Sequence, residues 1–224
     1  MATLVLVHGV AHGAWCWSRT RDELVRRGHE VVAVELPLTS LRDDAAAVQA
    51  ALDEVGRSAV LIGHSYGGLV ISRAAADRRD IQRLVYVAAM ILDGDDVYLK
   101  RVGAFPAAPL NALVKLTADG NFVIPPDAAA ACFYNECDDR DARDAAARLR
   151  PTAAVCLSGP VGAEPWRSIP ATYLVCERDR AIHPEFQRWM STRAAHVVTF
   201  DTDHSPFMSR VPQFAEFLDT VARD

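Results

Sequence analysis

Ser65 lies in the stretch Gly63-His64-Ser65-Tyr66-Gly67, which follows the apolar run from Ser58 to Ile62 and precedes a helix-like segment. A serine on a sharp strand-to-helix turn needs flanking glycines, because a Cβ at those positions would clash with the neighbouring strand or helix. Such a turn exposes the hydroxyl in a strained backbone. The spacing alone is a weak signal, but its setting between a strand and a helix predicts a nucleophilic serine.

A serine hydroxyl becomes a good nucleophile only when a base takes its proton and an acid orients that base. Asp179 and His204 each follow a β-type run, so the order along the chain is Ser, acid, His. His204 is the predicted base and Asp179 the predicted acid. His183, which follows the acid loop closely, is the main rival base. Rival acids remain open, and they are Glu177, Asp93, Asp95, Asp96, Asp201 and Asp203.

Acyl transfer also requires hydrogen-bond donors for the oxyanion that develops on the substrate. The backbone N–H of Tyr66 follows the nucleophile at the start of a helix, where the helix dipole adds partial positive charge. The N–H of Val10, in the loop after the first strand, is the predicted second donor. Gly9 lets this backbone approach closely, or is an ordinary turn glycine.

Composition restricts the class of protein. The chain has 224 residues, half of them hydrophobic, and a net charge of −5, with Lys100 and Lys115 as the only lysines. We therefore expect one domain with a small-molecule substrate and no nucleic-acid or membrane partner. The five cysteines form no CxxC pair, so neither a disulfide framework nor a metal site is expected. No organic cofactor is indicated. The N-terminus predicts a cytoplasmic protein, and a homodimer is left open.

Short apolar runs alternate with helical segments and predict an α/β fold with a doubly wound, mainly parallel six-stranded sheet covered by helices on both faces. The predicted buried strands are Leu4–Val7, Val31–Val34, Ala59–Ile62, Leu84–Ala88, Thr172–Cys176 and Val197–Phe200. The predicted helices are Trp15–Arg27, Leu41–Val55, Leu69–Asp77, Glu185–Arg193 and Val211–Ala222.

The alternation breaks between about residues 90 and 169, where prolines separate short helical stretches such as Asp127–Tyr134 and Asp138–Leu149. We interpret this segment as an inserted helical cap over the carboxyl edge of the sheet, where ligands bind in open α/β folds. The apolar cap residues could equally form a small core of the cap itself. The candidate substrate-binding residues are Gly9, Met90, Leu92, Phe105, Phe122, Phe133, Trp166 and Phe207.

Together these motifs resemble the alpha/beta-hydrolase superfamily over nearly the whole chain. The stretch from His8 to Trp15, His-Gly-Val-Ala-His-Gly-Ala-Trp, is similar to the signature of the hydroxynitrile lyase and methyl-ester esterase branch and its bacterial esterase relatives. Pro184-Glu185-Phe186-Gln187 is similar to that branch too. The resemblance implies Ser65 as nucleophile, His204 as base, Asp179 as acid, and the N–H groups of Val10 and Tyr66 as the oxyanion hole.

The chain departs from the cyanogenic lyases at two positions. The lysine that follows their catalytic histidine is Ser205 here, and their loop threonine is Gly9. Both changes favour a serine esterase acting on small to medium apolar or aromatic esters through an acyl-enzyme. Two alternatives remain: a lyase, cyclase or dehydratase of natural-product metabolism, and a ligand sensor without catalysis.

Overall fold

A six-stranded parallel sheet forms the centre of the computed structural model, which describes residues 1–223. Every neighbouring pair of its strands is parallel. In spatial order the strands are β2 (Glu30–Val34), β1 (Thr3–Val7), β3 (Ala59–His64), β4 (Ile81–Val87), β8 (Ala171–Cys176) and β9 (His196–Phe200). The predicted doubly wound α/β fold is confirmed.

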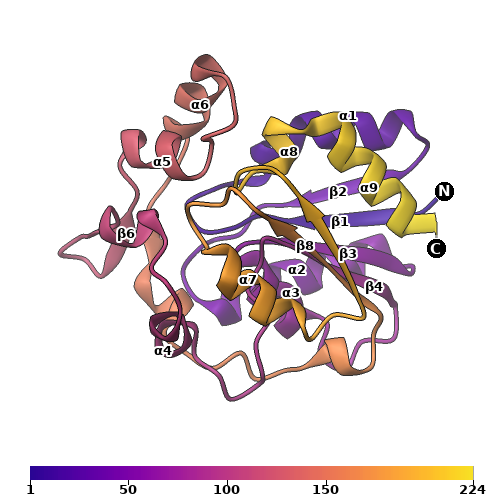
Figure 1. Cartoon of the computed structure of the whole chain (residues 1–224). Helices are drawn as coiled ribbons and strands as arrows, with labels where there is room; N and C mark the ends of the chain where they lie inside the picture. Colours follow the sequence, from indigo (N-terminus) through magenta and orange to yellow (C-terminus); the bar gives the residue numbers. More distant parts are fainter. Residues whose placement is uncertain (224) are drawn as a thin grey trace.

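Helices cover both faces of this sheet (Figure 1). On one face lie α1 (Ser18–Arg26), α8 (Pro206–Ser209) and α9 (Val211–Arg223), and on the other lie α2 (Leu41–Val55), α3 (Gly67–Ala74) and α7 (Pro184–Ser191). Side chains of β1 alternate between the faces: Val5 and Val7 join the core under α2 and α3, whereas Leu4 and Leu6 join the core under α1 and α9. Each central strand is therefore apolar on both sides.

Local signals set the ends of the helices. The Ser40 side chain accepts a hydrogen bond from the N–H of Asp43 at the start of α2, and Gly56 ends that helix at φ 61°. The segment predicted as one helix over Trp15–Arg27 instead begins as a 3-10 turn, Ala14–Trp17, before α1. A helix end that tightens into a 3-10 turn is common, because it satisfies free backbone groups.

The expectation that all six strands are buried is wrong for β2 and β9. These strands form the two edges of the sheet, and most of their residues are partly or fully exposed. Val197 in β9, for example, is 50% exposed. An edge strand pairs on one side only, and the sequence run does not reveal which strands end the sheet.

Between β4 and β8 the chain leaves the central layers, and the part with α4, α5 and α6 lies beyond the carboxyl ends of the strands (Figure 1). This segment contains α4 (Tyr98–Arg101), α5 (Pro126–Cys132) and α6 (Asp139–Ala146), together with the 3-10 turns Val102–Ala104, Pro109–Ala112, Ala154–Leu157 and Pro165–Arg167. It also contains an unpredicted antiparallel sheet of β5 (Lys115–Leu116), β6 (Asn121–Val123) and β7 (Thr152–Ala153). Strands of two or three residues are too short to show alternation in a sequence.

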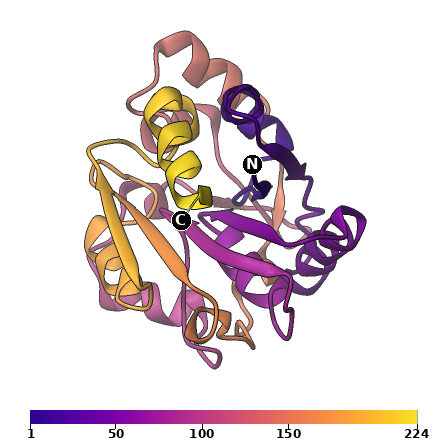
Figure 2. The same ribbon diagram turned by 90° about the vertical axis from the view of Figure 1, so that its right-hand side faces the viewer.

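The start of β1 and the end of α9 lie side by side in both views, on the side of the sheet away from the segment between β4 and β8 (Figure 2). Within residues 1–223, no helix has the length and hydrophobicity needed to cross a membrane. The predicted catalytic residues Ser65, Asp179 and His204 follow β3, β8 and β9, at the carboxyl edge of the sheet.

Replacing Leu174 in β8 tests the contribution of the central sheet. Leu174 is fully buried, so Leu174→Ala should lower the free energy of unfolding by about 2–5 kcal/mol through lost burial and a residual cavity. Urea unfolding followed by circular dichroism measures this change. Val197→Ala at the exposed edge is the control and should cost less than about 1 kcal/mol. Equal losses in the two variants would contradict the assignment of β8 to the core.

Candidate active site

Ser65 occupies the turn between β3 and α3 with φ 55°, a left-handed backbone conformation that is strained for a serine. Its N–H donates to the Val87 carbonyl (3.1 Å) and its own carbonyl accepts from the N–H of Met90 (3.0 Å). A Cβ on Gly63 would lie 2.6 Å from the carbonyl oxygen of Gly67, so the turn requires glycine there. The end of β4 thus stabilises the strained conformation that presents the serine.

Asp179 and His204 form a buried pair. Nδ1 of His204 donates to Oδ2 of Asp179 at 2.6 Å. The other oxygen, Oδ1, accepts from the N–H groups of Ala181 (2.7 Å) and Ile182 (2.9 Å), and the Gln187 amide donates to Oδ2 (2.7 Å). These bonds fix the carboxylate and keep the imidazole proton on Nδ1. Nε2 of His204 therefore carries a lone pair, and it has no hydrogen-bond partner within residues 1–223.

His64 links this pair to the serine turn. Its Nε2–H donates to the carbonyl oxygen of His204 (2.9 Å), and its ring lies 4.5 Å from the His204 ring, centroid to centroid. Phe133 stacks on His204 from the segment between β4 and β8, at 5.3 Å. The described residues show no hydrogen bond between Ser65 Oγ and His204 Nε2. Such bonds are often long in an empty site and shorten when substrate binds.

The loop after β1 is held by a neutral histidine. Nδ1 of His8 donates to the Gly9 carbonyl (2.8 Å), while its Nε2 accepts from the N–H of Leu36 (3.0 Å). The Gly9 carbonyl and the Val10 N–H belong to one planar trans peptide and point in opposite directions. His8 therefore fixes the direction of the Val10 N–H. Neither this N–H nor that of Tyr66 has an acceptor within residues 1–223.

His12 fixes the next peptide in the same way. Its Nδ1 donates to the Val10 carbonyl (2.8 Å) and its Nε2 accepts from the Tyr134 hydroxyl (2.8 Å). The N–H of Ala11, in the same peptide as that carbonyl, donates to Thr152 Oγ1 (2.9 Å). Both partners come from the segment between β4 and β8. That segment therefore positions the loop that follows β1.

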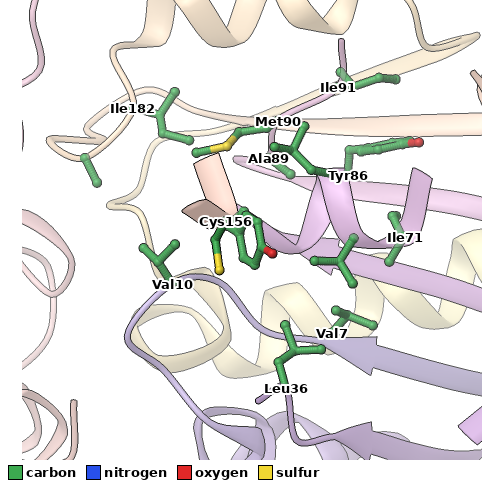
Figure 3. Packing of buried hydrophobic residues seen from close by; sticks show 14 of the residues in the cluster. Val7, Val10, Leu36, Ile71, Tyr86, Ala89, Met90, Ile91, Cys156 and Ile182 are labelled. Atoms are coloured by element: carbon green, nitrogen blue, oxygen red, sulfur yellow. The ribbon is translucent and has the colours of Figure 1, made fainter. Parts of the chain in front are cut away.

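A cavity of about 410 Å³ opens beside Ser65. Apolar side chains from several loops and from the segment between β4 and β8 form most of its lining. Figure 3 shows three lining residues from different loops, Val10, Met90 and Ile182, among side chains of the core. The complete lining is Val10, Ser65, Met90, Tyr98, Leu99, Val102, Leu110, Asn111, Val114, Leu116, Phe122, Ile124, Phe133, Ala154, Leu157, Ala181 and Ile182.

Comparison with known proteins agrees with this geometry. A model of the alpha/beta hydrolase family matches residues 4–217. This chain is an alpha/beta hydrolase. The hydrolase is 26% identical to methyl jasmonate esterase 1 of Vitis vinifera over 97% of this chain and 95% of that protein. The predicted family is confirmed.

Solved structures share the fold of this hydrolase. A pyrethroid hydrolase from Sphingobium faniae superposes with a TM-score of 0.87 at 20% identity, covering 99% of this chain and 97% of that one. An extracellular alpha/beta-hydrolase from a Paenibacillus species gives a TM-score of 0.87 at 22% identity, covering 100% of both chains.

His183 and five of the six rival acids have other partners in the hydrolase, and the sixth acid, Asp95, is exposed. Nδ1 of His183 accepts from the N–H of Glu185 and caps α7. The Asp203 carboxylate is buried and accepts from the N–H groups of Glu136 (3.0 Å) and Ser205 (3.1 Å). The remaining paired acids bind arginines: Asp93 with Arg193, Asp96 with Arg101, Glu177 with Arg188 and Asp201 with Arg178. Only Asp179 bonds to the His204 ring.

The predicted substrate-binding residues divide into two groups. Met90, Phe122 and Phe133 line the cavity, whereas Gly9, Leu92, Phe105, Trp166 and Phe207 do not. Phe105 stacks on Phe186 at 4.5 Å, and Phe207 packs on Trp17 at 4.7 Å in the core under α1 and α9. Trp166 donates to the Leu92 carbonyl (3.4 Å). Aromatic type and nearness in sequence do not reveal which face a side chain takes.

Several cavity residues and the hydrogen bonds of two histidines were not predicted from the sequence. Tyr98, Leu110 and Ile182 line the cavity, and apolar character alone did not distinguish them from core residues. His8 and His12 stood in a recognised motif, yet their hydrogen bonds depend on partners far along the chain. Residues 1–223 contain no group of three His, Cys, Asp or Glu side chains placed to hold a metal ion.

The buried histidines predict a dependence of stability on pH. Burial lowers the pKa of His8 to about 4 and that of His12 to about 3. In the unfolded chain the pKa of each imidazole returns to about 6.5. Below about pH 6.5 the unfolded chain therefore binds more protons than the folded protein. As the pH is lowered, the free energy of unfolding should decrease by about 1.4 kcal/mol per pH unit for each histidine.

His12→Gln should make this slope shallower by one proton between about pH 6 and pH 4.5, whatever its effect on absolute stability. Urea unfolding at several pH values measures the slope. Parallel curves for wild type and variant would show that His12 binds its proton equally well in both states, which contradicts the burial argument.

Proposed function

We propose that this alpha/beta hydrolase is a serine esterase that hydrolyses small to medium neutral carboxylic esters through an acyl-enzyme. The observation that carries the proposal is the buried bond between His204 Nδ1 and Asp179 Oδ2, which leaves Nε2 of His204 free to accept a proton. Ser65 lies on a strained turn at the wall of the apolar cavity. Geometry and tautomer together suit base-assisted acyl transfer.

The reaction follows from these positions. Nε2 of His204 takes the proton of Ser65 Oγ as the oxygen attacks the ester carbonyl. The N–H groups of Val10 and Tyr66 stabilise the oxyanion, and the Asp179 carboxylate stabilises the imidazolium. The imidazolium then protonates the departing alcohol. Water, deprotonated by the same nitrogen, attacks the acyl-enzyme and releases the acid.

The cavity favours neutral, apolar substrates. No charged side chain lines it, so a carboxylate or phosphate would lose its hydration without gaining an ion pair. Residues of the segment between β4 and β8 supply much of the wall, in keeping with the proposed cap over residues 90–169. The relatives named for methyl-ester hydrolysis support an ester with a small alcohol. Cytoplasmic location and a homodimer stay predictions.

Labelling with a fluorophosphonate tests the activated serine. Wild type should form an adduct on Ser65, located by peptide mass spectrometry, and Ser65→Ala and His204→Ala should abolish it because nucleophile and base are both required. His183→Ala, at the start of α7, is the matched control and should label normally. Absence of an adduct in folded wild type rejects the esterase mechanism and turns attention to lyase, cyclase or ligand-sensing activity.

The His8 bond predicts a contrast between two substitutions. The Asn amide can take the place of Nδ1 and donate to the Gly9 carbonyl, whereas the Gln amide takes the place of Nε2 near Leu36. His8→Gln should therefore lower kcat by about 10²–10³-fold, the usual cost of an oxyanion donor. His8→Asn should retain most of the activity.

The two variants should differ little in KM, because the donor acts mainly on the oxyanion. Affinity for a trifluoromethyl ketone, which forms a tetrahedral adduct with the serine, should fall in parallel with kcat. Equal losses in both variants, or a loss confined to KM, would refute an orienting function for His8.

A further inference from the structure

The cavity beside Ser65 has very few polar groups. Besides Ser65, only Tyr98 and Asn111 among its lining residues carry an oxygen or nitrogen in the side chain. Asn111 is exposed, whereas Tyr98 is 8% exposed. Tyr98 is therefore the one buried polar residue of the lining that the proposed acyl transfer does not use.

The Tyr98 hydroxyl differs from every other tyrosine hydroxyl of the chain. All five tyrosines are buried. Four have hydrogen-bond partners within the protein: Tyr66 with Asp44 (2.6 Å), Tyr86 with Ser72 (2.9 Å), Tyr134 with His12 (2.8 Å) and Tyr173 with the Ala89 carbonyl (2.7 Å). The Tyr98 hydroxyl has no partner within residues 1–223, and it is not among the fully enclosed polar atoms. Its free hydrogen-bonding capacity is thus available to the cavity.

One ring contact places Tyr98 beside the helix that follows the Asp179 loop. Its ring lies 6.0 Å from that of Phe186, which belongs to the helix after the Asp179 loop. Burial, and then the negative charge of Asp179, raises the pKa of Tyr98. The hydroxyl therefore keeps its proton and acts as a donor. A protonated phenol donates to an oxygen acceptor, and with no charged side chain among the lining residues described, the cavity favours a neutral acceptor.

We propose that Tyr98 is a specificity-determining residue whose hydroxyl donates to a second oxygen of the substrate, separate from the ester that reacts. The inference rests on the proposed esterase function. The substrate is then an apolar ester whose acyl chain carries a ketone, ether or similar neutral acceptor. A hydrocarbon ester would cover the hydroxyl without replacing its bond to water, and a site built around a donor discriminates strongly against such a ligand.

Matched esters test this selectivity. A series of methyl oxooctanoates, with the ketone at successive carbons, is compared with methyl octanoate. Wild type should prefer one ketone position by about 10–100-fold in kcat/KM, the range of one well-placed hydrogen bond. Tyr98→Phe should abolish that preference and raise kcat/KM for methyl octanoate, because the variant has no buried hydroxyl left without a partner. Asn111→Leu, at an exposed position of the lining, should keep the preference.

Binding separates this proposal from the esterase mechanism. In Ser65→Ala protein, which cannot form an acyl-enzyme, calorimetry should show tighter binding of the preferred keto ester than of methyl octanoate. Adding Tyr98→Phe should remove the difference. No preference at any ketone position, or one that survives Tyr98→Phe, overturns the proposal even if esters are hydrolysed. Selective binding without wild-type turnover would instead reject the esterase function and retain the Tyr98 assignment.

Discussion

The left-handed backbone of Ser65 is the constraint on which the rest of the site depends. The last residue of β4, Val87, accepts from the Ser65 N–H, and Met90 in the loop that follows donates to the Ser65 carbonyl, so both bonds stabilise φ 55°. The same turn starts α3 and directs the N–H of Tyr66 away from the helix. It also requires close approach of the loop after β1, since a Cβ on Gly9 would lie 2.8 Å from that of Ser65. Ser65 and the N–H groups of Val10 and Tyr66 therefore share one packing arrangement.

Buried polar groups support this arrangement. Burial lowers the pKa of His8, His12 and His64, so these rings remain neutral. Both nitrogens of His8 and of His12 are hydrogen-bonded, whereas His64 is bonded through Nε2. Asp44 accepts from the Tyr66 hydroxyl (2.6 Å) and from the N–H of Leu38 (2.7 Å), and burial raises the pKa of this carboxyl. Buried hydrogen bonds of this kind favour a single conformation, which a preorganised site requires.

The cavity wall has the opposite character. It is almost entirely apolar, so substrate binding must come mainly from the burial of apolar surface, and a single hydroxyl at Tyr98 can then decide between substrates of similar shape. The two functions are separate: the polar networks lie under the loops and fix backbone N–H groups, while the side chains that line the cavity are mostly hydrocarbon. Substitutions in the cavity lining can therefore change the substrate preference without altering the polar networks.

Much of this could be predicted from local sequence. The glycines around Ser65 and the six apolar runs are short-range signals, because steric exclusion and periodicity act over a few residues. The order of Ser65, Asp179 and His204 is a feature of the fold class and can be read directly from the chain. Tertiary structure alone decided which strands became edges, which aromatic residues faced the cavity, and which groups His8 and His12 bonded. Tyr134 reaches His12 from 122 positions away, and the Tyr98 hydroxyl differs from those of the other tyrosines because no group within residues 1–223 bonds to it. Such properties depend on packing between distant segments, which no local pattern encodes.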